Sequence, residues 1–124
     1  MPNKTQNPRI KIYDLEERTA RFAEEMIDFC RSLPKDLINS TFISQLIRSS
    51  SSIGANYMEA DGAESKKDFQ HKIAICKKES KESRHWLRLI AHANPEKVNE
   101  CRNFWKEATE LSLIFSSIII KKKF

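Results

Sequence analysis

Apolar residues recur every three or four positions along most of this chain, which is the spacing of one face of an α-helix. Proline or glycine breaks the pattern at Pro34, Gly62 and Pro95. No strand pattern, internal repeat or low-complexity stretch is visible. The pattern therefore predicts an all-α chain of four long helices. They cover about residues 15–33, 41–60, 66–92 and 96–120.

Polar residues at the segment starts predict where the helices begin. Asp14 can cap the first helix and Ser40 the second, because their side chains can accept from free backbone N–H groups. Ser65 and Asp68 have the spacing of a capping box at the start of the third helix. We therefore expect each helix to start within a residue or two of these positions.

The apolar faces predict the core. In the third and fourth segments the apolar and small residues alternate in steps of four and three, which is a heptad. The predicted core positions are Leu15, Phe22, Met26, Phe29, Cys30 and Leu33, then Ile43, Leu46, Ile47, Ser50, Ile53, Gly54 and Tyr57, then Phe69, Ile73, Cys76, Ser80, Ser83, Leu87 and Ile90, and finally Val98, Cys101, Trp105, Ala108, Ser112, Phe115 and Ile119. Short connections favour antiparallel neighbours, so we expect an antiparallel up-and-down four-helix bundle.

Length and composition place few limits on this fold. The 124 residues suit one domain, residues 1–124, in which residues 1–12 form a flexible basic tail. No signal sequence or span long enough for a membrane is visible, so we expect a cytoplasmic protein without membrane contact. Cys30, Cys76 and Cys101 fall at apolar positions, which favours buried free thiols over a redox or metal role.

Positive charge gathers in three places, although the net charge is only +5. Both chain ends are basic, with Lys121, Lys122 and Lys123 at the C-terminus. The third helix also has a marked excess of basic residues. Four of these repeat on one side of it and are candidate contacts for nucleic-acid phosphates: Lys77, Lys81, Arg84 and Arg88. A solvated surface without a ligand is the alternative interpretation.

A second set of positions lies beside the predicted core on the second and third helices. If these helices are antiparallel, Arg48 lies level with Glu79 and Glu82 and can bridge them. Trp86 outside the heptad indicates a second buried contact, either in a wide monomer core or, as we favour, in a subunit interface. The predicted interface or interhelical polar network comprises Arg48, Ser52, Asn56, Glu59, Glu79, Glu82 and Trp86.

Catalytic and metal-binding patterns are weak. Glu82 and His85 have the spacing used by di-iron bundles, but such sites need two of these motifs and two further carboxylates. The chain contains no phosphate-binding loop, dinucleotide fingerprint or zinc spacing. We therefore expect no enzyme activity, no metal and no cofactor. An enzyme assembled from scattered residues is the remaining alternative.

Several stretches resemble a known family: QLIRS at residues 45–49, SIGANYME at 52–59 and SKKDF at 65–69, followed by Glu79 and Glu82. The chain is similar to the four-helix-bundle proteins encoded by intervening sequences of bacterial large-subunit ribosomal RNA genes. The accessory variability proteins of diversity-generating retroelements are similar to that family. One departure is visible, because the glycine expected directly after the motif glutamate is Ala60, and Gly62 follows two residues later.

The resemblance implies a homopentamer, a ring-like homo-oligomer, and association with nucleic acid or with a reverse transcriptase. It supplies no catalytic residues. Together with the charge pattern it leads to one interpretation: a non-enzymatic, homo-oligomeric bundle that binds RNA or DNA through a basic surface, as an accessory factor to a reverse transcriptase. The alternative is a protein-interaction scaffold without physiological nucleic-acid binding.

Overall fold

The computed structural model describes residues 14–122, and over this range it contains four long α-helices and no strand. The elements are α2 (Leu15–Arg31), α3 (Leu37–Asp61), α4 (Lys66–Ala93), a 3₁₀ turn η2 (Pro95–Lys97) and α5 (Val98–Lys122). The all-α class predicted from the sequence is confirmed. The predicted basic tail, residues 1–12, and the side chains of the C-terminal lysines lie outside the described part.

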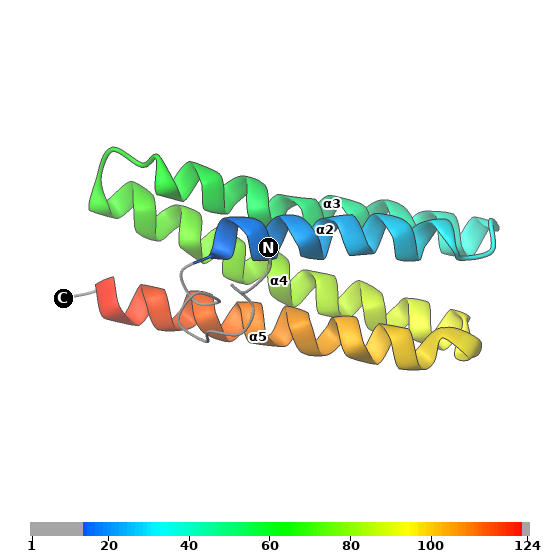
Figure 1. Ribbon diagram of the computed structural model, residues 1–124. Helices are drawn as coiled ribbons and strands as arrows, with labels where there is room; N and C mark the ends of the chain where they lie inside the picture. Colours follow the sequence, from blue (N-terminus) through cyan, green and yellow to red (C-terminus); the bar gives the residue numbers. More distant parts are fainter. Residues whose placement is uncertain (1–13, 123–124) are drawn as a thin grey trace.

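The chain reverses direction at each connection between helices (Figure 1). Contacts between α3 and α4 agree with this view, because Glu59 is bonded to Lys72 while Ser49 is bonded to Ser83. Residue numbers therefore rise along one helix as they fall along the other. With 17 residues α2 is the shortest of the four, and it lies beside only part of the length of α3 and α5 (Figure 1).

The helix starts follow local chemistry, with one correction. Ser65 caps α4 as predicted, accepting from the backbone N–H of Asp68. The second helix starts a turn earlier than Ser40, because Asp36 accepts from the N–H of Asn39 at 2.8 Å and is its cap. Asp14 occupies the N-cap position of α2, but its side chain makes no capping hydrogen bond.

The early start of α3 is tied to a buried amide pair. Asn39 and Asn94 exchange side-chain hydrogen bonds at 3.0 and 2.9 Å, and both are almost fully buried. Asn39 also donates to the carbonyl of Pro34, and Asn94 donates to that of Ile90. Because buried amides need partners, this pair joins the start of α3 to the end of α4.

Most predicted core residues are buried, and the faces predicted for α2 and α4 agree best. In α5, Cys101, Ala108, Leu111 and Phe115 point inward, but the prediction is wrong for Val98 and Trp105, which are 38% and 40% exposed. Phe104 instead packs on Phe29 of α2, with the ring centroids 5.3 Å apart. Adjacent positions on α5 therefore serve different neighbours, Phe104 toward α2 and Trp105 toward α4.

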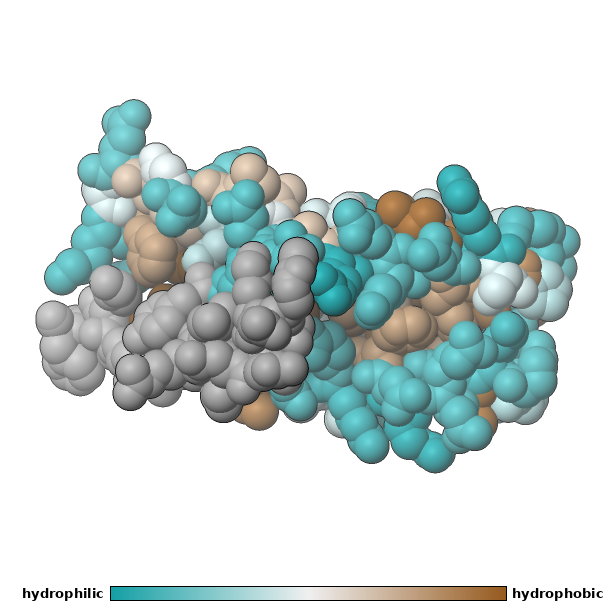
Figure 2. All heavy atoms as spheres, in the orientation of Figure 1, coloured by the Kyte–Doolittle hydropathy of each residue, from teal (hydrophilic) through white to brown (hydrophobic). Residues whose placement is uncertain are grey.

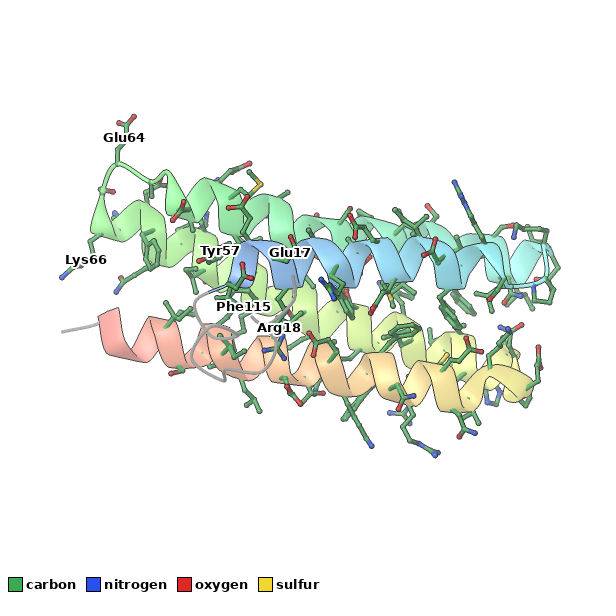
Figure 3. The ribbon with its side chains drawn as sticks, viewed as in Figure 1. Glu17, Arg18, Tyr57, Glu64, Lys66 and Phe115 are labelled. Atoms are coloured by element: carbon green, nitrogen blue, oxygen red, sulfur yellow. The ribbon has the colours of Figure 1, made fainter. Side chains whose placement is uncertain are left out.

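Besides its apolar face, α2 has a close contact with α3 and an ion-pair network with α5. A Cβ added at Gly54 of α3 would meet the hydroxyl oxygen of the buried Thr19 at 3.0 Å, so glycine permits close approach of the two helices. On the other side, Arg18 donates to both oxygens of Glu107 at 2.7 and 2.9 Å and to Glu110 at 2.8 Å. Figure 3 shows Arg18 reaching from α2 toward α5.

Candidate nucleic-acid interface

A groove of about 420 Å³ lies between α4 and α5. Its floor is apolar and its rim is cationic, since Arg88, Arg102 and Lys106 are all exposed there. The size falls within the range of small-ligand sites. The lining residues are Leu87, Arg88, Ala91, Val98, Cys101, Arg102, Trp105 and Lys106. The groove exists because α5 turns Trp105 and Val98 outward beside α4, whereas the sequence pattern placed both in the core.

The four phosphate contacts predicted on α4 lie in two different environments. Arg88 lies on the groove rim, and Lys81 and Lys77 continue along the same side of α4. Among residues 14–122, none of these three cations is in an ion pair. They are therefore available to an anionic ligand.

Arg84, the fourth predicted contact, is instead packed against α5. Its guanidinium carbon lies 4.8 Å from the centroid of the Trp105 ring, which is a cation–π geometry. One terminal nitrogen donates to the Thr109 hydroxyl at 3.0 Å, and Nε is buried without a partner in the described part of the chain. Arg84 thus positions the indole, and its charge is only partly open to solvent.

Arg102 and Lys106 are not among the phosphate contacts that the sequence predicts, and Trp105 is predicted there as a core residue. Arg102 and Lys106 are four residues apart and so share one side of α5, and this short repeat of positive charge is the signal that could have indicated them. No feature of the sequence distinguishes Trp105 from the other large residues of this heptad, such as Phe115. Only the rotation of α5 against α4 brings these three side chains next to Arg88.

The predicted polar network forms largely between α3 and α4. Arg48 donates to Glu79 at 3.3 Å and also to Glu82, and Trp86 donates its indole N–H to Glu82 at 3.1 Å. Arg48 therefore lies level with both carboxylates, as the sequence predicted. Glu79 is only 7% exposed, so this arginine supplies the charge that a buried carboxylate needs.

The remaining members of the predicted network are further along α3. Glu59 accepts from Lys72 at 2.7 Å, and this hydrogen bond raises the pKa of Lys72. Asn56 donates to the backbone oxygen of Ser52, which is a contact within α3 alone. The structure therefore joins four of the seven residues in one network between α3 and α4, while Glu59 pairs with Lys72 and Ser52 and Asn56 form a local pair.

A second hollow, of about 360 Å³, lies between α2 and α5. Figure 2 looks onto this side of the molecule and shows hydrophobic surface between the two helices, bordered by hydrophilic side chains. Its lining includes the carboxylates of Glu25, Asp28 and Glu100 and no cation. Negative charge there repels phosphate, so the groove between α4 and α5 is the better anion site.

The three thiols are unsuited to nucleophilic chemistry. Burial raises the pKa of Cys30 and of Cys101 to about 11 and that of Cys76 to about 12, so all three remain neutral thiols. No cluster of three or more metal-binding side chains occurs in the described residues. His85 is exposed beside the Trp86 ring, while Glu82 is engaged by Arg48.

No helix within residues 14–122 has the length and apolar character needed to cross a membrane. The described residues therefore form a small four-helix, all-α protein with a cation-rimmed groove on its outside.

Comparison with known proteins gives the family. The model of the 23S rRNA-intervening sequence protein family matches residues 12–117, so the chain belongs to that family. A crystal structure of a protein of unknown function from the S23 ribosomal protein family of Bacteroides thetaiotaomicron is 27% identical, with a TM-score of 0.75. The match covers 84% of this chain and 96% of that one. No curated protein matches the chain.

Proposed function

We propose that this protein is a non-enzymatic subunit that binds the backbone of a nucleic acid along the outer side of α4 and α5. The observation that carries the proposal is a line of five cations without ion pairs in the described part of the chain. They are Lys77, Lys81, Arg88, Arg102 and Lys106.

The geometry of this line suits a polyanion. Residues 77 and 88 are separated by about 16 Å along α4, at 1.5 Å per residue, so a strand of several phosphates can lie against them. Nearby carboxylates do not neutralise the line. Glu107 and Glu110 are held by Arg18, Glu82 by Arg48, and Glu100 lies 3.5 Å from Lys97.

The first test is a charge reversal of Lys77, Lys81 and Arg88 to Glu. We expect RNA affinity to fall at least tenfold at moderate salt, because each lost phosphate contact removes counterion release. The slope of log affinity against log salt should become shallower by about two to three units. Fluorescence anisotropy with a labelled RNA measures both quantities.

The matched control reverses three exposed cations elsewhere, Arg21, Arg31 and Lys67, which changes the net charge equally. This control should keep most of the affinity. Equal loss in both variants, or no RNA binding by the unmodified protein, would contradict the proposal and favour the alternative, a protein-interaction scaffold. A purified protein that turns over a substrate would contradict the non-enzymatic part.

We further propose that the bundle associates with copies of itself through the outer side of α3, as the subunit of a ring. The support is the composition of this helix: its 25 residues contain only Arg48, Glu59 and Asp61 as charged side chains. Two of these are paired to α4, and Leu37, Ile38 and Met58 are 85%, 60% and 58% exposed. Depletion of charge with exposed apolar groups is typical of the centre of a protein interface.

The resemblance to accessory variability proteins extends the proposal to a reverse transcriptase as partner and to a pentamer as the assembly. Free buried thiols and a nucleic-acid ligand both fit the cytoplasm. Co-purification with a reverse transcriptase encoded next to the gene tests this partner. Absence of the reverse transcriptase from the salt-washed complex would contradict the partnership.

A further inference from the structure

We infer that the groove between α4 and α5 takes an unpaired nucleobase against Trp105, so that the protein holds single-stranded rather than duplex nucleic acid. The inference rests on the proposed function and adds what the ligand presents to the protein. It starts from one unusual feature: the floor of a groove rimmed by cations is almost entirely apolar.

The rim and the floor of the groove are complementary to different parts of one ligand. Arg88, Arg102 and Lys106 around the opening suit phosphates, whereas Leu87, Ala91 and Trp105 carry no positive charge for an anion. A duplex does not present the flat faces of its bases, because these are stacked on one another inside it. An unpaired nucleotide presents both a phosphate and a flat apolar ring, which matches both surfaces.

Trp105 is held in a position suited to stacking. The Arg84 guanidinium lies 4.8 Å from the ring centroid and is itself fixed by its bond to Thr109. Arg84 does not line the groove, while the indole does, so the ring remains open on the groove side. An indole that is already ordered loses little side-chain entropy when a base stacks on it.

An acidic amphipathic helix of a partner protein would also match an apolar floor and a basic rim. The line of cations continues from the groove to Lys81 and Lys77, beyond the end of the apolar floor. A strand with a phosphate at every nucleotide uses the whole line, which favours nucleic acid over a helix.

The test compares one RNA strand of about 12 nucleotides, without self-complementarity, with the duplex formed by annealing its complement. We expect the strand to bind at least fivefold tighter than the duplex. Trp105→Ala should weaken binding of the strand at least fivefold and leave the duplex unchanged, while Trp105→Phe retains most of the affinity. Leu113→Ala, an exposed apolar residue of α5 outside the groove, should change neither.

Equal affinity for strand and duplex, with no effect of Trp105→Ala, would overturn the inference. If charge reversal of Lys77, Lys81 and Arg88 still abolishes binding, the proposed function survives that result. The inference would also be overturned if a synthetic acidic amphipathic peptide binds only when Trp105 is present, while the RNA affinity does not depend on Trp105. Loss of self-association in Trp105→Ala by native mass spectrometry would overturn it too, because the groove would then hold a second copy.

Discussion

At the scale of single residues, the three cysteines show how packing controls chemistry. Cys76 of α4 is fully buried, and its thiol donates to the carbonyl of Ile53 in α3 at 3.4 Å. Burial disfavours the thiolate and raises the pKa of Cys76 to about 12. The thiol therefore stays protonated in the folded protein at pH values where an unfolded thiol ionises.

This difference makes stability depend on pH in the alkaline range. Above about pH 9 the unfolded chain loses the Cys76 proton while the folded chain retains it, so the free energy of unfolding falls as pH rises. Between pH 8 and pH 10 this thiol should account for a loss of about 1 kcal/mol. Urea denaturation at both pH values measures it, with Cys76→Ala as the variant in which the loss should be smaller. An identical pH dependence in the variant would contradict the assignment.

Glu79 is the other residue whose environment is decided by a neighbour. It is almost fully buried, and Arg48 from α3 reaches it across the helix pair. A buried carboxylate without a cation is costly, so this contact links the register of α3 and α4 to an electrostatic requirement. The hydrogen bond between the hydroxyls of Ser49 and Ser83, at 2.9 Å, joins the residue after Arg48 to the residue one turn beyond Glu79 and supports the same register.

At the scale of helices, α2 depends on few contacts because it is short. Arg18 is its main polar link to α5, through Glu107 and Glu110. The bidentate geometry with Glu107 and the low exposure of the arginine make this pair stronger than a typical surface ion pair.

Arg18→Met should therefore lower the free energy of unfolding by about 1–2 kcal/mol. Arg21→Met, on the same helix, removes only an exposed pair with Glu17 at 3.4 Å and should cost less than about 0.5 kcal/mol. Chemical denaturation of both variants measures the difference. Equal losses of unfolding free energy in the two variants would contradict a specific contribution of the link between α2 and α5 to stability.

At the scale of the whole molecule, charge is divided unevenly among the helices. The outer side of α3 is nearly free of charge, α4 is strongly basic, and the hollow between α2 and α5 is acidic. The two proposed surfaces, one for self-association and one for a polyanion, therefore lie on different helices, so occupation of one leaves the other open.

Ala55→Arg tests the first of these surfaces, because Ala55 is exposed on α3, where a new charge would have to be buried in an interface. We expect the variant to shift toward the monomer in native mass spectrometry, with an unchanged helical circular dichroism spectrum. Ala20→Arg, an exposed alanine on α2, makes the same chemical change and should leave the assembly intact. A monomeric unmodified protein would contradict self-association altogether.

The sequence by itself determined the helices and most of the core, because both depend on local periodicity. The buried faces of α2 and α4 could be predicted because a helix places residues three and four apart on one side. The Ser65 cap could be predicted because capping depends on the residue at the helix start. Arg48 could be paired with Glu79 and Glu82 because two helices joined by a short turn have almost no freedom of register.

Only the tertiary structure decided which neighbour each helix face meets. The buried hydrogen bond from Asn39, near the start of α3, to Asn94 joins residues 55 positions apart, which no local pattern encodes. The rotation of α5 sends Phe104 toward α2 and Trp105 toward α4, and this alone forms the groove. Periodicity gives the phase of a helix, but its orientation within the bundle follows from the packing of large side chains contributed by all of its neighbours.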